Sequence, residues 1–164
     1  MPSEKPQFPP PGTPHELESN TTLTPRFDGA GGIAAVATDA DTGEVLMLAW
    51  MNAEALALTI RTGEAHFWSR SRGRIWRKGE ESGNVLQVVE MRTDCDQDAV
   101  WMRVRLTGHG AACHTGHRTC FYRRIPMGPG GVESNSANAT TSSLMEHAGT
   151  PRVFDPAQVY GPKT

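Results

Sequence analysis

The 164-residue sequence lacks several features that define whole classes of protein. It has no apolar run approaching the ~20 residues that a membrane-spanning helix needs. No apolar stretch follows the first charges at the N-terminus, as it would in a secretory signal. The formal net charge is only -2, which gives no reason to expect binding to bulk nucleic acid. We therefore expect a cytoplasmic protein with no membrane and no nucleic acid among its partners.

Cysteine is scarce, with three residues in the chain, and disulfides would leave one of them unpaired. An odd number of thiols fits a cytosolic protein that keeps them reduced for metal binding or catalysis.

Proline is absent from residues 26–125, although the chain contains twelve. Seven prolines lie in residues 1–25, an arm that cannot bury much apolar surface. The other five lie in residues 126–164, where MGPGG and ESNSANATTSS have the composition of a linker. We therefore predict a flexible Pro-rich arm at 1–25, one folded domain at 26–126 and a flexible tail at 127–164. Both terminal segments are expected to be dispensable for chemistry.

The predicted domain contains short β-prone segments around one helical segment. Asn52 is a suitable N-cap for a helix over residues 53–62, and Gly63 ends it. Strands are expected at residues 33–38, 44–50, 65–70, 74–78, 84–92 and 100–106, and residues 119–125 complete the core. One helix among six or seven strands predicts an α+β fold with a mainly antiparallel sheet.

Cys95, Cys113 and Cys120 follow the spacing C-x17-C-x6-C and contain no C-x2-C knuckle. A closed structural zinc site usually has four ligands, whereas a catalytic zinc keeps three protein ligands and an open position. The pattern therefore favours a catalytic zinc whose bound water is the nucleophile. The alternative is three buried structural cysteines, since free cysteine behaves as a small apolar residue.

A general base is expected beside this zinc. Three thiolates give the complex a formal charge of -1, which weakens the pull of the metal on its water compared with neutral imidazole ligands. His114 follows Cys113 directly and is the first candidate, with His109 and His117 as alternatives.

Three carboxylates alternate along the segment DCDQD, at Asp94, Asp96 and Asp98. In an extended chain they project to one face, while Cys95 points to the other. Oxygen-only ligands suit Mg²⁺, Mn²⁺ or Ca²⁺. The alternative is a solvated acidic turn without a metal.

Residues 61–78 combine five arginines and a lysine with interleaved aromatic side chains, including Trp68 and Trp76. Arginine suits phosphate recognition, and aromatic faces suit a purine. The following GEESG segment (79–83) has backbone amides that can approach an anion. Two alternatives remain at this point, an ordinary exposed hairpin face and a surface for single-stranded RNA.

Taken together, residues 30–124 resemble the phosphoribosyl-AMP cyclohydrolases. The matching stretches are DADTGEVLMLAWMN (39–52), TGEAHFWSRSRGRIWRKGEESGN (62–84), QVVEMRTDCDQDA (87–99) and GAACHTGHRTCFYR (110–123). Residue 84 is Asn, where many family members carry His. The arm and tail have no counterpart in the family core, and no helical pyrophosphatase domain is visible after Arg124.

The resemblance implies a monofunctional enzyme of L-histidine biosynthesis that hydrolyses 1-(5-phosphoribosyl)-AMP, opening the adenine ring between nitrogen 1 and carbon 6. It implies a cytoplasmic homodimer in which Cys95, Cys113 and Cys120 bind zinc between two subunits. It further implies magnesium on the three aspartates of the DCDQD segment. Candidate contacts to the nucleotide come from the basic and glycine-rich segments: Trp68, Arg70, Ser71, Arg72, Trp76, Lys78, Gly79, Ser82, Gly83 and Asn84.

Two rival functions remain. A zinc-dependent nucleobase deaminase also attacks a purine carbon with metal-bound water, but its H-x-E and P-C-x-x-C motifs are missing. An RNA-binding module with structural zinc would need a full four-ligand site and would turn over no substrate.

Overall fold

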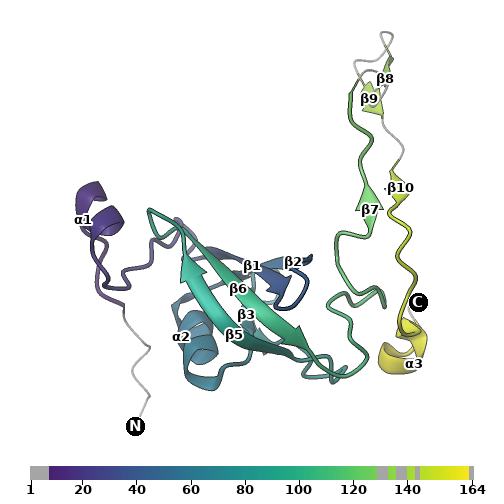
Figure 1. Cartoon of the computed structure of the whole chain (residues 1–164), viewed down its shortest axis with the longest axis horizontal. Coiled ribbons are helices and arrows are strands. Elements are labelled where there is room, and N and C mark those ends of the chain that lie inside the picture. The colour runs from purple at the N-terminus through teal and green to yellow at the C-terminus, as the bar shows by residue number, and fades with distance from the viewer. Residues whose placement is uncertain (1–7, 129–132, 136–139, 143–144, 163–164) are drawn as a thin grey trace.

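The computed structural model of the chain describes residues 8–128, 133–135, 140–142 and 145–162. Its centre is a four-stranded sheet in the order β2-β1-β6-β5, formed by β1 (Ile33–Asp39), β2 (Val45–Met51), β5 (Leu86–Thr93) and β6 (Ala99–Leu106) (Figure 1). β1 runs antiparallel to β2 and parallel to β6, and β5 runs antiparallel to β6. The predicted α+β class with a mainly antiparallel sheet is confirmed, with one parallel pair at its centre.

The main helix, α2 (Ala53–Thr62), has the predicted bounds. The Asn52 side chain accepts a hydrogen bond from the backbone N–H of Ala55, and Gly63 closes the helix in the left-handed region at φ 70°. β3 (His66–Ser69) and β4 (Arg74–Arg77) form a separate antiparallel hairpin. The helix, the hairpin and the sheet share one apolar core, with fully buried side chains that include Leu46, Leu56, Phe67 and Met102.

The N-terminal segment contains a short helix, α1 (Pro14–Ser19), that the sequence analysis did not expect. Thr13 and Glu16 form a reciprocal capping box at its start, which is a local signal in the sequence T-P-H-E. Leu17 is buried, and the Phe8 ring lies 6.2 Å from the Phe27 ring. The described part of the arm therefore packs against the domain.

Residues 119–125 were expected to complete the core, but only their beginning does so. The backbone N–H of Cys120 donates to the Leu46 carbonyl (2.7 Å), which fixes the chain to β2. Phe121 and Ile125 then lie exposed, and the only strand of this segment within the described residues is β7 (Arg123–Arg124). Beyond Cys120 this segment therefore leaves the edge strand β2 and adds no strand to the central sheet.

The part of the chain that contains β7 to β10 forms an extended projection from the body (Figure 1). β7 pairs with β10 (Glu146–His147), and β8 (Glu133–Asn135) pairs with β9 (Thr140–Ser142). The chain then returns to the body as α3 (Pro156–Tyr160). Within the described ranges, no helix is both long enough and apolar enough to cross a membrane.

Candidate functional site

A cavity of about 410 Å³ lies between the glycine-rich loop after β4 and the cysteine-containing loop after β6. Its lining brings together several residues predicted from separate motifs: Arg72, Trp76, Lys78, Gly79, Ser82, His114 and Cys120. Residues that complete the lining are Met47, Arg77, Glu80, Glu81, Ala112 and Tyr160. Groups suited to phosphate and purine therefore share one cavity with a thiol and an imidazole.

Five predicted nucleotide contacts do not line this cavity: Trp68, Arg70, Ser71, Gly83 and Asn84. Alternate residues of a strand face opposite sides, so Trp68 points away from buried Phe67. The Arg70 guanidinium lies over the Trp50 ring, 4.9 Å from its centroid, on another part of the surface.

Asn84 is buried and links two loops. Its side-chain oxygen accepts a hydrogen bond from the backbone N–H of His109 (2.7 Å). A Cβ on Gly108, which has φ 61°, would lie 2.6 Å from the same oxygen, so this turn requires glycine. The structure thus places Asn84 where it joins the 79–84 loop to the turn after β6.

Cys113 and Cys120 are brought together by the loop after β6. The Cys120 thiol donates a hydrogen bond to the Cys113 sulfur, and this bond is the main cause that lowers the pKa of Cys113 to about 5. Burial of Cys113 acts in the opposite direction, while the Thr115 hydroxyl, 2.9 Å from the sulfur, and the charge of His114 lower the pKa further. The same hydrogen bond and burial raise the pKa of Cys120. Two neighbouring sulfurs, one of which has a lowered pKa, form a donor set that fits a thiolate-binding metal.

Lys78 lies buried beside this thiol pair. Burial lowers the pKa of Lys78, and the negative charges of Cys120 and Cys113 oppose that effect. The sequence predicted Lys78 as a contact to the nucleotide, and its position also places a cation close to the two sulfurs.

Cys95 lies elsewhere, in a second cavity of about 240 Å³. This cavity is lined by residues of the arm between Leu17 and Leu23 and by Thr93, Asp94 and Gln97. Among the described residues, the one group of three or more His, Cys, Asp or Glu side chains arranged to hold a metal ion is Asp94, Asp96 and Asp98. The three cysteines of one chain therefore do not form a single ligand set.

The three aspartates of this acidic cluster have ligand oxygens that all lie within 4.8 Å of one another. The Asp96 charge is the main cause that raises the pKa of Asp98, followed by burial and by Asp94. Asp94 Oδ1 also accepts hydrogen bonds from the backbone N–H groups of Asp98 (3.0 Å) and Ala99 (3.1 Å). Asp96 pairs with Arg26 at 2.7 Å. Such mutual repulsion is relieved by a bound cation.

Gln97 holds the acidic cluster to the N-terminal segment, a role that sequence reasoning missed. Its backbone has φ 59°, and its side chain is buried. The side-chain oxygen accepts from the backbone N–H of Thr24 (2.8 Å), and its amide donates to the Thr22 carbonyl (3.3 Å). A single Gln between aspartates gives no local signal for such contacts.

The three candidate bases have different surroundings. His114 is exposed and lines the larger cavity. His117 is buried and stacked on Tyr122 at 3.7 Å, and burial lowers its pKa. The His109 ring lies 5.0 Å from Phe154, outside the cavity lining. Geometry therefore favours His114.

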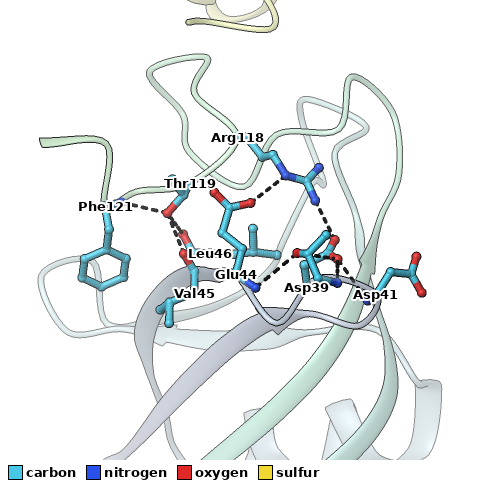
Figure 2. Close-up of polar contacts among 9 residues, drawn as sticks. Asp39, Asp41, Glu44, Val45, Leu46, Arg118, Thr119 and Phe121 are labelled. Carbon is cyan, nitrogen blue, oxygen red and sulfur yellow. Dashed lines mark hydrogen bonds and ion pairs between the residues drawn. The ribbon is translucent and has the colours of Figure 1, made fainter. Parts of the chain in front are cut away.

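An ion-pair network fixes the loop that carries the two cysteines (Figure 2). Arg118 contacts Asp39 (2.7 Å) and Glu44 (2.8 Å) at the turn between β1 and β2. The Thr119 hydroxyl donates to the Val45 carbonyl at 2.7 Å. Burial alone would raise the pKa of Asp39, but hydrogen bonds from Thr42 and Asp41 and the Arg118 charge hold it below its ordinary value.

We expect Arg118→Met to destabilise the protein by about 1–2 kcal/mol, a value that allows for the partial exposure of the guanidinium. For a chain of this size, that loss lowers the melting temperature by roughly 3–6 °C. The pKa of Asp39 is lower in the folded protein than in the unfolded chain. The ionised Asp39 therefore stabilises the fold fully above its ordinary pKa of about 3.9, and this stabilisation is lost as the pH falls through the lowered pKa of the folded state. The difference in the free energy of unfolding between Arg118→Met and wild type should therefore become smaller below about pH 4.

Thermal unfolding followed between pH 3 and pH 8 would measure this difference. Arg105→Met is the matched control, since Arg105 is exposed and forms no ion pair with any described residue. Equal stability of Arg118→Met and Arg105→Met at neutral pH would show that the network does not hold the loop.

Comparison with known proteins gives a consistent result. Residues 47–122 match the family model described as phosphoribosyl-AMP cyclohydrolase. A protein named phosphoribosyl-AMP cyclohydrolase from Sinorhizobium fredii is 55% identical over 148 residues, 90% of each chain. Proteins of the same name from Rhizobium leguminosarum bv. trifolii and Rhodopseudomonas palustris are 53% identical over 145 residues and 50% identical over 161 residues. The first of these two alignments covers 88% of this chain and 89% of the relative. The second covers 98% of this chain and 99% of the relative. The similarity thus extends beyond residues 30–124 into both terminal segments.

Proposed function

The chain belongs to the phosphoribosyl-AMP cyclohydrolase family, and we propose that it hydrolyses 1-(5-phosphoribosyl)-AMP by opening the adenine ring between nitrogen 1 and carbon 6. This reaction places the enzyme in L-histidine biosynthesis. The observation that carries the proposal is the cavity that joins His114 and Cys120 to Arg72, Trp76 and Lys78. Because the chain belongs to this family, we favour the cyclohydrolase function over the two alternatives, a nucleobase deaminase and an RNA-binding module. Three free thiols fit a cytoplasmic location.

We further propose a zinc site that is completed by a homodimer. Cys113 and Cys120 would supply two ligands, because the loop after β6 brings their side chains together. Cys95 of a second copy would supply the third, since Cys95 of the same chain lies in a different cavity. When bound, zinc supplies the activation of the water that acts as nucleophile.

The protein's own side chains orient the nucleotide and move protons. Arg72 and Lys78 offer positive charge to phosphate groups, and Trp76 offers a flat surface to the purine. His114 lines the cavity, and it would take a proton from the attacking water and pass it to the departing ring nitrogen.

An absorbance assay for conversion of phosphoribosyl-AMP tests the function, with zinc and magnesium measured on the same sample. We expect turnover by zinc-loaded protein and its loss when zinc is removed. Zinc-loaded, folded protein without any turnover would refute the proposed reaction.

The acidic cluster is proposed to bind magnesium, so Asp98→Asn should raise the Mg²⁺ concentration needed for half-maximal activity by about tenfold or more, the loss expected when one charged ligand of a hard cation becomes neutral. Asp98 is the cleanest position, because Asp94 also accepts backbone hydrogen bonds and Asp96 pairs with Arg26. A magnesium titration of activity measures the effect.

Asp41→Asn in the exposed turn after β1 is the control and should leave the titration unchanged. Full activity of wild-type enzyme after selective removal of Mg²⁺, with zinc retained, would count against this magnesium site.

A further inference from the structure

The C-terminal segment returns to the candidate site after the extended projection. The backbone N–H of Val153 donates to the Gly116 carbonyl (2.7 Å), and the Phe154 ring lies 5.0 Å from His109. Gly116 has φ 87°, and the Phe154 carbonyl oxygen fills the space that a side chain on Gly116 would need. The segment is thus seated closely against the loop that carries Cys113 and Cys120.

α3 lies beside the loop that follows β6 (Figure 1), and one of its residues lines the larger cavity. The Asp155 side chain caps the helix by accepting from the backbone N–H of Ala157 (3.0 Å). Tyr160 ends the helix, with its ring 6.3 Å from the Phe154 ring, and it lines the cavity together with Cys120 and Lys78.

We propose that Tyr160 forms one wall of the nucleotide cavity and packs its ring against the bound nucleotide, an inference that rests on the proposed function. Apart from His114, Trp76 and Tyr160 are the aromatic side chains among the described lining residues. Positive groups for the phosphates come from the basic segment, so the flat surface is what Tyr160 adds. The tail is then part of the substrate site instead of a dispensable linker.

The relative from Rhodopseudomonas palustris aligns over 98% of the chain, so the alignment extends into the C-terminal segment. Phe154 would act as a positioning residue, because its ring lies between His109 and Tyr160.

Kinetics and AMP binding by full-length variants test the proposal. Tyr160→Ala should raise the KM for phosphoribosyl-AMP and the Kd for AMP by about tenfold or more, as expected for a lost stacking surface. The kcat should change by less than about threefold, because the contact is the same in substrate and transition state. Tyr160→Phe, which keeps the ring, should behave like wild type. Phe154→Ala should raise both constants by releasing the helix.

Gln158→Ala, at an exposed position of the same helix, is the matched control. If Tyr160→Ala lowers the thermal stability of the protein, Tyr160→Leu takes its place in the test. The expected rise in KM and Kd is the same for both variants. Equal KM and Kd in Tyr160→Ala and wild type would overturn the proposal, as would losses of equal size in Tyr160→Phe and Tyr160→Ala. Absence of AMP binding to wild type at millimolar concentration would also overturn it.

The two proposals fail in distinguishable ways. AMP binding that weakens in Tyr160→Ala, in a protein that does not turn over phosphoribosyl-AMP, would support the aromatic wall and refute the reaction. Turnover of phosphoribosyl-AMP that does not depend on Tyr160 would support the reaction and refute the aromatic wall.

Discussion

Serine at position 113, 120 or 95 in place of cysteine is expected to reduce turnover by about 10³-fold or more, since activation of the nucleophile by a metal contributes several kcal/mol. Bound zinc should fall in each variant, because the neutral oxygen of serine is a poor replacement for thiolate. Metal analysis and the absorbance assay on the same samples measure both effects. Full activity in any one variant would remove that cysteine from the zinc site.

The separation of Cys95 from the other two sulfurs gives a sharper test. Subunits with Cys95→Ser mixed with subunits with Cys113→Ser can form heterodimers in which one of two sites has all three thiols. Random 1:1 pairing in a symmetric dimer should restore about a quarter of wild-type activity, since half of the dimers are mixed. Cys113→Ser mixed with Cys120→Ser is the control and should restore none. Equal recovery in both mixtures would contradict a site shared between subunits.

Local patterns in the sequence were sufficient to predict the main helix and β6 of the domain. The Asn52 cap and Gly63 predicted the exact bounds of the main helix, and alternation predicted β6. The parallel pairing of β1 with β6 could not be predicted, because strand partners depend on contacts between residues more than sixty positions apart. The short strands of the projection were not predicted either, because the composition of that segment favours a linker.

In the candidate site too, some residues could be predicted from local motifs and others depend on the tertiary structure. Contiguous motifs identified Arg72, Trp76 and Lys78, but they could not separate them from Trp68 and Arg70, which lie on the same hairpin and face other surroundings. The direction of each side chain depends on strand register and turn geometry, which the motif does not specify. Tyr160 could not be assigned to the site from the sequence, because only the docking of Phe154 and Val153 brings it to the cavity.

His114→Ala is expected to reduce kcat by about 10²-fold or more while zinc remains bound, as is typical for the loss of a general acid–base group. Among the three candidate imidazoles, His114 is the one that lines the cavity together with Cys120. It follows Cys113 in the chain, and its charge acts on that thiol, so its ring belongs to the surroundings of the proposed metal. An imidazole exchanges protons near neutral pH and suits transfer from water to the leaving nitrogen.

Single-turnover rates and zinc content of the same variant test this assignment, with His109→Ala as the matched control. The His109 ring does not line the cavity, so its loss should change kcat by less than about threefold even if KM rises through Phe154. Loss of zinc together with rate in His114→Ala would make His114 a fourth metal ligand that must be displaced before water can bind. Unchanged rate and unchanged zinc would assign the proton transfer to another residue, and His66, His109 and His117 would then be replaced in turn. A rate that falls in His114→Ala with zinc retained, and not in His109→Ala, would support His114 as the proton-transfer group.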